Sequence, residues 1–497
     1  MGIVRNQAIK NSFFSYIGVA LGYVNVIMLF PAFFTSEQFG LVNLMISIAF
    51  VYAQFSSIGL VLGITKYFPF FKSEDKYHNL FLSYVIILSF SGFAITTLLF
   101  FVLKPFLVLS YLDKSKLFVD YFIFLIPLSL FTLAYNVFEA LARVIFKTVL
   151  STFVREVVIR LFTTLDILLF VFKIIDFEGF VYIFVGIYGF SALFILFQII
   201  SSKEYKFVFS LKGLNRDKFV ELLKYGTYNL FSGAAMFVGQ KIDIMMIGSM
   251  IGLSIVGAYS LYLYIATVIY VPMKALSKIS VPVITNSWKE NNIAQINDIY
   301  KRTSLIQIIF GVLLYVGVII NKHNLFMILK KPEYIQNFDI FYFVGLAILI
   351  DVAVGLNSEI IASSKYYRYD ALFNLVLLIV SVVSNIIIIP IFGGVGAAIA
   401  SAISFFVFNF IKWLFLFLKY KMQPVSVKHV FVSIIGIVCL MINYFLPILS
   451  NIYLDIGFRS LIISIIYLGV LYLTKISDDL NERVNIYKNM VFKKGAA

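Results

Sequence analysis

A small set of charged side chains interrupts stretches that are otherwise apolar, and these residues are the best placed to do chemistry. Lys241 and Asp243 lie two positions apart, deep inside one such stretch. The others lie closer to the ends of their stretches or stand alone: Arg160, Lys274, Lys278, Lys412, Asp166, Asp351 and Glu359. A charge at the centre of a bilayer costs about 2.5–3.5 kcal/mol on insertion scales, so it usually faces a cavity or a partner.

The cations could bind an anionic group such as a pyrophosphate through charge-assisted hydrogen bonds. The candidate binding residues are Lys241, Lys274, Arg160, Lys278 and Lys412. Lysines near helix ends can instead extend to the headgroups, and Glu156–Arg160 and Glu139–Arg143 have the i,i+4 spacing of ordinary ion pairs. On one continuous helix, Lys241 and Asp243 would diverge by about 200°.

The carboxylates could couple transport to an ion or could simply neutralise the cations. The candidates for coupling to H⁺ or Na⁺ are Asp243, Asp166, Asp351 and Glu359. We expect no other cofactor, no metal and no catalytic residue, because the only cysteine is Cys439 and the three histidines are far apart in the sequence.

The composition places these residues in a membrane. The chain has 497 residues, of which 61% are hydrophobic and 13% charged, whereas soluble domains have about 45–50% and about 25%. A span needs about 20 mostly apolar residues. We find about fourteen candidate spans: 12–34, 40–64, 80–103, 118–142, 156–172, 179–200, 226–250, 257–281, 303–320, 338–362, 371–391, 395–418, 429–448 and 459–474.

Basic residues predict the orientation. When the connections are assigned alternately to two sides, one side receives about 27 Lys and Arg residues and the other about 8. The richer side, which holds both termini, should be cytoplasmic. We therefore expect a multi-pass protein of the bacterial inner (plasma) membrane.

The two halves of the chain begin alike. A shift of 217 positions pairs Gly22 with Gly239, Gly40 with Gly257 and Leu44 with Leu261. Six spans separate the copies, so both run in the same direction, as in bundles related by a pseudo-twofold axis along the membrane normal. We expect an N-terminal six-helix bundle (1–200), a cytoplasmic amphipathic linker (201–225), a second six-helix bundle (226–418), and two extra spans with a cytoplasmic tail (419–497).

Three stretches resemble the polysaccharide flippases of the multidrug/oligosaccharidyl-lipid/polysaccharide exporter superfamily. They contain FPAFFTSEQFGL (30–41), KIDIMMIGSMIGLSIVGAYS (241–260) and NIIIIPIFGGVGAAIA (385–400). The resemblance implies movement of an undecaprenyl-pyrophosphate-linked oligosaccharide from the cytoplasmic to the outer leaflet by alternating access, for surface polysaccharide biosynthesis. It also implies that the partners are this glycolipid and the bilayer, without nucleic acid, and we expect a monomer.

Three other functions remain open. A peptidoglycan-precursor (lipid II) flippase also has fourteen spans, but its cavity is richer in arginine. A cation-coupled multidrug exporter on the same fold typically has a carboxylate in its first helix, and span 12–34 has none. A membrane-embedded glycan polymerase or ligase would need a large outer loop, whereas every connection here is shorter than the roughly 50 residues of a small domain. We therefore expect a transporter and not an enzyme.

Overall fold

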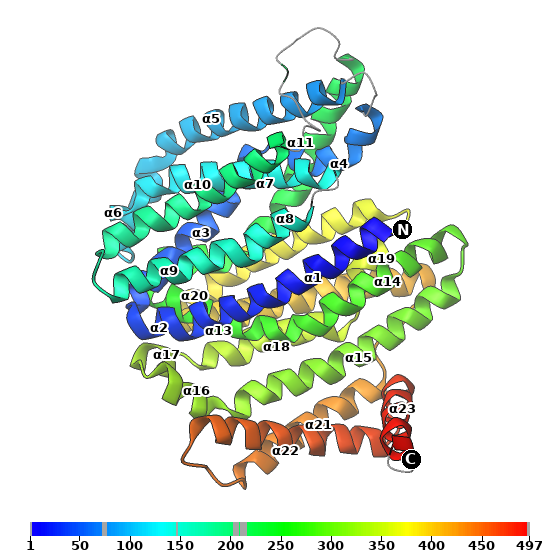
Figure 1. Ribbon diagram of the computed structural model, residues 1–497. Coiled ribbons are helices and arrows are strands. Elements are labelled where there is room, and N and C mark those ends of the chain that lie inside the picture. The colour runs from blue at the N-terminus through cyan, green and yellow to red at the C-terminus, as the bar shows by residue number, and fades with distance from the viewer. Residues whose placement is uncertain (1, 72–76, 146–147, 202–207, 209–215, 495–497) are drawn as a thin grey trace. The chain divides into compact units, whose positions relative to one another are not determined.

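The structure, a computed structural model, describes residues 2–71, 77–145, 148–201, 208 and 216–494, and all regular structure in these residues is helical (Figure 1). The chain divides into two compact units, Met1–Leu261 and Tyr262–Ala497. Ten helices in the described residues are long and apolar enough to cross a membrane. The prediction of an all-α polytopic membrane protein is confirmed.

Most helices follow the predicted spans closely. The first unit contains α1 (Gly2–Tyr23), the π-helical segment η1 (Val24–Leu29), α2 (Phe30–Phe33), α3 (Ser36–Ser56), α4 (Leu60–Phe71), α5 (Tyr77–Leu112), α6 (Lys116–Asp120), the 3₁₀ segment η2 (Phe122–Phe124), α7 (Leu125–Val144), α8 (Thr148–Phe153), the π-helical segment η3 (Val154–Val158), α9 (Ile159–Val171), α10 (Phe177–Ser201), α11 (Arg216–Gly239) and α12 (Ile242–Met250). The unit boundary lies inside α13 (Leu253–Ala266).

The second unit continues with a 3₁₀ segment and ten further helices. They are η4 (Thr267–Tyr270), α14 (Val271–Lys289), α15 (Ile293–Ile320), α16 (Lys322–Leu329), α17 (Pro332–Gln336), α18 (Asp339–Ala353), α19 (Asn357–Ala362), α20 (Tyr367–Tyr420), α21 (Val427–Tyr444), α22 (Ile452–Leu473) and α23 (Asp478–Lys494).

The long helix α20 contains two predicted spans. A straight helix of its 54 residues would be about 81 Å long at 1.5 Å per residue, against about 30 Å of hydrocarbon. Gly393, however, has φ 61° and ψ −137°, which breaks the helix three residues after Pro390. The break lies between the predicted spans 371–391 and 395–418.

Several predicted spans are interrupted helices, and three of them are not among the ten long apolar helices of the described residues. Span 156–172 is formed by η3 with α9, span 226–250 by α11 with α12, and span 338–362 by α18 with α19. The interruptions lie where the sequence carries charges or a glycine in a left-handed conformation, such as Gly355 at φ 72°. Length and hydropathy alone therefore identify these spans less easily than the other ones.

Several helices begin or end outside their predicted spans, as α5 does at Leu112 and α15 at Ile293, and two further differences have a clear cause. The second span begins at Ser36 and not at 40, because Thr35 caps it: its hydroxyl accepts a hydrogen bond from the Gln38 N–H, and the Gln38 side chain accepts one from the Thr35 N–H. The fourteenth span begins at Ile452 and not at 459, so Asp455 and Arg459 lie inside a helix and not in a loop.

The predicted linker, 201–225, lies partly outside the described residues, which omit 202–207 and 209–215. Its amphipathic character stays a prediction, as does the division into 1–200, 201–225, 226–418 and 419–497.

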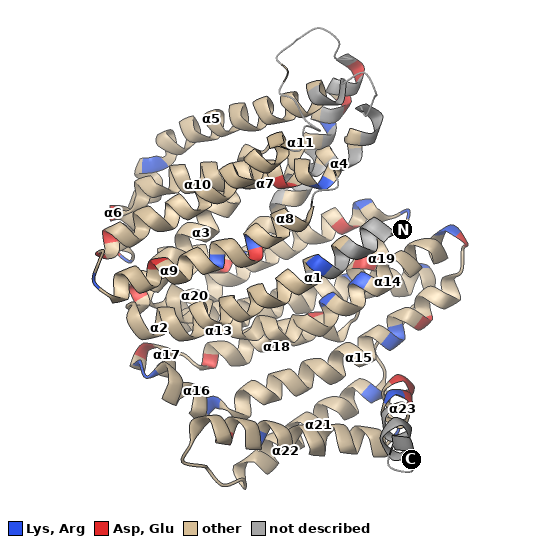
Figure 2. Cartoon of the chain, viewed as in Figure 1, with Lys and Arg blue, Asp and Glu red and all other residues tan. Residues whose placement is uncertain are grey.

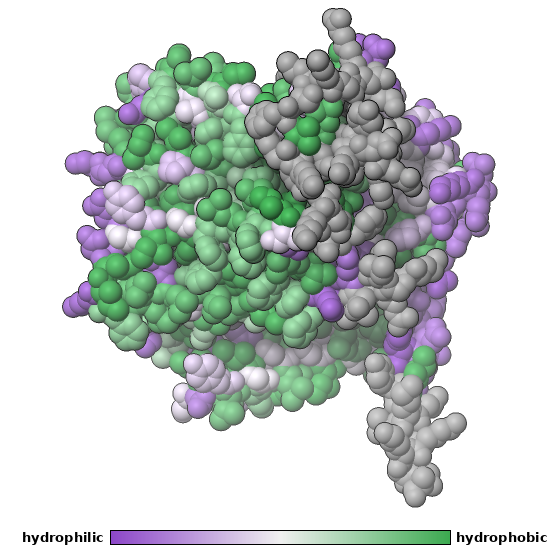
Figure 3. All heavy atoms as spheres, turned by 45° about the horizontal axis from the view of Figure 1, so that its top comes forward, coloured by the Kyte–Doolittle hydropathy of each residue, from purple (hydrophilic) through white to green (hydrophobic). Residues whose placement is uncertain are grey.

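Apolar side chains cover much of the surface, as expected next to lipid. The face drawn in Figure 3 carries a broad area of hydrophobic residues, and exposed positions on α5 include Leu98, Val102, Phe106 and Leu109. Charged residues gather mainly at helix ends and connections (Figure 2). The few charges inside helices therefore need individual explanations.

Candidate functional site

The seventh predicted span is broken where its charged residues lie. α11 ends at Gly239, and Lys241 is in a non-helical conformation (φ −121°, ψ −11°) before α12 begins at Ile242. The divergence expected for one continuous helix is therefore wrong. The first backbone N–H groups of a half-helix lack intrahelical partners and favour anions, so Lys241 and the start of α12 place positive charge together.

Lys241 and Asp243 have different surroundings. The Asp243 carboxylate accepts a hydrogen bond from the Tyr259 hydroxyl of α13 at 2.9 Å. Lys241 is half-buried, and among the described residues no carboxylate lies within ion-pair distance of its amine. Its role in binding an anion stays a prediction.

Arg160 is held by partners on two helices. It forms an ion pair with Glu156 at 2.9 Å, and its guanidinium donates a hydrogen bond to the carbonyl of Gly18 in α1. The predicted i,i+4 pair is confirmed. The other suggested pair is wrong, because Glu139 pairs with Arg155 at 2.6 Å and not with Arg143. Arg160 thus contributes to joining α1 and α9 in this conformation.

Asp166 is a buried acid on α9. Its side chain is 1% exposed, and neither carboxyl oxygen has a hydrogen-bond partner among the described residues. One turn further along α9, Phe170 stacks on Phe34 with ring centroids 4.5 Å apart. The side chain therefore does not neutralise a described cation, and its role in ion coupling stays a prediction.

The second unit brings several predicted residues together in one buried polar cluster. Asp351 of α18 accepts hydrogen bonds from the Tyr270 hydroxyl and from the Asn409 amide of α20, both at 2.8 Å. Asn409 in turn accepts a bond from the Asn357 amide at 2.9 Å. These bonds connect η4, α18, α19 and α20, so the cluster crosses the break between α18 and α19.

Lys412 belongs to the same cluster and is only 1% exposed. Its amine lies 2.7 Å from Asp370 and donates a hydrogen bond to the Ser358 hydroxyl at 2.7 Å. It also lies 4.0 Å from the centroid of the Phe408 ring. In this conformation the amine is fully occupied by the protein, and its binding of substrate stays a prediction.

Glu359 completes the cluster on the side of α14. It accepts a hydrogen bond from the Ser277 hydroxyl at 2.9 Å through Oε1, while its buried Oε2 has no hydrogen-bond partner among the described residues. Asp351, Glu359 and Lys412 are close enough for their charges to interact. With Asp370, the cluster contains three acids and one amine, so its full ionisation would leave it net negative.

Helix α14 also presents two lysines away from this cluster. Lys274 and Lys278 are both exposed, on a different face of the helix from the buried Ile284 and Ser287. Four residues apart, their Cβ atoms are about 5–6 Å from each other. Among the described residues neither amine has an ion-pair partner. They form a dicationic surface that could contact a diphosphate.

Some residues of the cluster are absent from the sequence-based candidates. They are Tyr270, Asn357, Asp370 and Asn409. Of these four, only Asn409 could have been identified from the sequence, because it lies three positions before Lys412 on the same helix face. Within the described residues no three His, Cys, Asp or Glu side chains form a group that could hold a metal.

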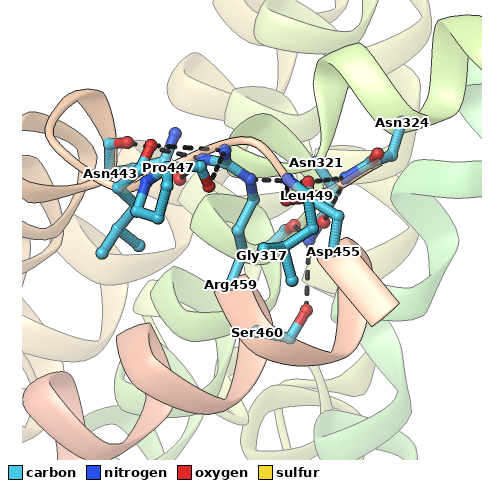
Figure 4. Close-up of polar contacts among 10 residues, drawn as sticks. Gly317, Asn321, Asn324, Asn443, Pro447, Leu449, Asp455, Arg459 and Ser460 are labelled. Carbon is cyan, nitrogen blue, oxygen red and sulfur yellow. Dashed lines mark hydrogen bonds and ion pairs between the residues drawn. The ribbon is translucent and has the colours of Figure 1, made fainter. Parts of the chain in front are cut away.

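A second buried network fixes the last two spans (Figure 4). Asp455 and Arg459 of α22 form an ion pair at 2.7 Å with side chains 1% and 7% exposed. Asp455 also accepts bonds from the Asn324 amide at 2.6 Å and the Leu449 N–H at 2.8 Å. Arg459 donates to Asn443 at 2.8 Å and to the Pro447 carbonyl at 2.9 Å. The network joins α22 to α16, to the end of α21 and to the connection that follows it.

Comparison with solved structures identifies the fold. The chain is similar to a lipid II flippase, MurJ, in an inward closed conformation, with a TM-score of 0.74 and 14% identity over 95% of this chain and 99% of that one. It is also similar to an inward-facing multidrug resistance MATE family transporter of the MOP superfamily, with a TM-score of 0.62 and 14% identity over 82% and 94%. A third similar structure is a mutant of VcmN, a MATE transporter of Vibrio cholerae. Its TM-score is 0.50, with 13% identity over 83% of this chain and 97% of that one.

No family model matches the sequence, and the search of curated proteins finds no match. The chain has the fold of MOP superfamily transporters and flippases, and it is a multi-pass membrane protein. At these identities the likeness concerns the fold and leaves the substrate open.

Proposed function

We propose that the chain flips an undecaprenyl-pyrophosphate-linked oligosaccharide from the cytoplasmic to the outer leaflet of a bacterial inner membrane, by alternating access, for surface polysaccharide biosynthesis. The observation that carries the proposal is the similarity to a lipid II flippase along 95% of the chain. The similarity to the inward-facing MATE family transporter extends over 82% of the chain. Similarity to a glycolipid flippase extends over more of this chain than similarity to a drug transporter.

The exposed lysines of α14 support an anionic substrate. Lys274 and Lys278 have no acidic partner among the described residues, and their spacing suits two neighbouring phosphates. Lys241, at the break before α12, is a separate candidate cation in the first unit. We expect both termini to be cytoplasmic, which places the lysines of α14 toward the leaflet where the glycolipid is made.

The buried cluster of the second unit supports coupling to H⁺ or Na⁺. Three acids with one amine favour uptake of a cation or a proton, because uncompensated buried charge is costly. Asp351 and Glu359 are the proposed coupling residues in this cluster, and Asp166 and Asp243 are the candidates in the first unit.

Lipid II is the second candidate substrate, because the similar flippase is described as acting on it. Depletion of the protein in its own cells distinguishes the two. We expect a prenyl-pyrophosphate oligosaccharide to accumulate on the inner leaflet and surface polysaccharide to disappear, while peptidoglycan synthesis continues. Arrest of peptidoglycan synthesis would instead support lipid II, and unchanged levels of both glycolipids would contradict the proposal.

A further inference from the structure

An aromatic cluster in the second unit brings together three connections that the basic residues assign to the cytoplasm. Tyr366, directly before α20, packs on Phe415 and Tyr420 near the end of the same helix, with ring centroids 5.6 Å and 6.3 Å away. Tyr420 also packs on Trp288 at the end of α14, at 5.0 Å. These contacts hold both ends of α20 next to the end of α14.

Two lysine ammonium groups gather at the Tyr366 ring. The amine of Lys365 lies 5.2 Å from the ring centroid and that of Lys419 lies 5.7 Å from it, within the reach of about 6 Å for a cation–π contact. Both lysines are exposed, and among the described residues neither has a carboxylate within ion-pair distance. Asp370, five residues after Lys365, is bound to Lys412 at 2.7 Å. The two positive charges are therefore uncompensated.

Exposed apolar side chains adjoin the two lysines along α20. Tyr369 and Leu372 follow Lys365 with exposed fractions of 44% and 52%, and Leu418 directly precedes Lys419 with 62%. Lysines at the ends of membrane helices extend to the headgroups, and the cytoplasmic leaflet carries anionic lipids. A ligand with both a negative headgroup and acyl chains therefore matches this surface better than free phosphate does.

We propose that Lys365, Lys419 and the Tyr366 ring form a binding site for an anionic phospholipid of the cytoplasmic leaflet, such as phosphatidylglycerol. The two amines bind the headgroup phosphate through charge-assisted hydrogen bonds, and the apolar neighbours contact the acyl chains. The ring holds two like charges close together, and a bound anion relieves their repulsion. This lipid stays in its leaflet and is not the cargo, so the site does not depend on the proposed function.

Native mass spectrometry of the purified full-length protein tests the site. Phosphatidylglycerol and phosphatidylcholine with the same acyl chains would be titrated separately, and the bound molecules counted. We expect the parent to bind phosphatidylglycerol more tightly. Lys365→Ala with Lys419→Ala should weaken this binding about 30-fold, since each lysine near an anionic lipid contributes about five-fold. Equal binding of the two lipids by the parent, or of phosphatidylglycerol by the parent and the double variant, would overturn the proposal.

The matched control is Lys10→Ala with Lys224→Ala. These exposed lysines of α1 and α11 belong to the first unit and to the same predicted side of the membrane, so the double variant loses the same charge. It should bind phosphatidylglycerol like the parent. A loss as large as that of the Lys365 and Lys419 variant would show that net charge alone attracts the lipid, and would reject the site.

Tryptophan fluorescence locates the bound lipid. The chain has two tryptophans, so Trp413→Phe leaves only Trp288, which packs in the aromatic cluster. Brominated phosphatidylglycerol should quench Trp288 more than brominated phosphatidylcholine at the same mole fraction, and Lys365→Ala with Lys419→Ala should remove the difference. Equal quenching by the two lipids would place the lipid elsewhere and contradict the proposal.

Competition distinguishes the sources of phosphate. Neither inorganic phosphate nor a short-chain prenyl pyrophosphate should relieve the quenching of Trp288 by brominated phosphatidylglycerol. Relief by inorganic phosphate would show that the acyl chains are not recognised. Relief by the prenyl pyrophosphate would assign the surface to the cargo. Either result would reject a phospholipid site.

Discussion

At the scale of single residues, burial separates the intramembrane lysines into two kinds. Lys412 is enclosed by Asp370, Ser358 and Phe408, so it is already neutralised. Lys274 and Lys278 are exposed and have no acidic partner among the described residues. Of these three lysines, Lys274 and Lys278 are therefore the ones available to a ligand in this conformation.

Replacement of Lys274 by Ala should weaken binding of a short-chain prenyl pyrophosphate to the purified protein. We expect about a ten-fold loss of affinity for one charge-assisted contact, a larger loss for Lys274→Ala with Lys278→Ala, and partial retention for Lys274→Arg. Titration calorimetry or fluorescence with a labelled prenyl pyrophosphate would measure it.

Lys289→Ala is the matched control for this prediction, since Lys289 is an exposed lysine at the other end of α14. Equal affinities of the parent and the double variant would exclude the α14 lysines from the binding site.

At the scale of elements, the last two spans depend on a buried ion pair. Asp455→Leu would leave Arg459 buried without its carboxylate, which typically costs about 3–5 kcal/mol. Asp455→Leu combined with Arg459→Leu should cost less, because no uncompensated charge remains. Thermal unfolding of the purified protein in detergent would report both.

The control for the ion pair is Asp298→Leu. Asp298 and Arg302 form an i,i+4 pair at 2.9 Å, like Asp455 and Arg459, but both side chains are more than half exposed. Exposed pairs contribute little to stability, so the melting temperature should hardly change. A melting temperature of Asp455→Leu equal to that of the parent would contradict a stabilising role for this network.

Hydropathy predicted the helices well and their interruptions poorly. Apolar length identifies a span, but the break at Lys241 and the cap at Thr35 depend on one or two residues. The sequence places the start of α22 too late, because an arginine beside an apolar stretch is typical of a loop. In the structure Asp455 and Asn443 bind the Arg459 guanidinium inside the protein. The cluster around Asp351 was missed in part, because Asp370 and Lys412 are 42 residues apart and their contact depends on the reversal at Gly393.

At the scale of the whole molecule, one chain combines two related halves, a fold shared with glycolipid and drug transporters, and cations suited to an anionic cargo. The nature of the cargo is the claim on which the rest of the function depends.

The most direct test is a flipping assay with the parent protein alone. Purified protein would be placed in vesicles that carry a labelled prenyl-pyrophosphate oligosaccharide on the inner leaflet, and an enzyme added outside would modify only molecules that reach the outer leaflet. We predict that the protein accelerates modification well beyond that in protein-free vesicles. Equal rates in the two kinds of vesicle, across both H⁺ and Na⁺ gradients, would contradict the flippase function.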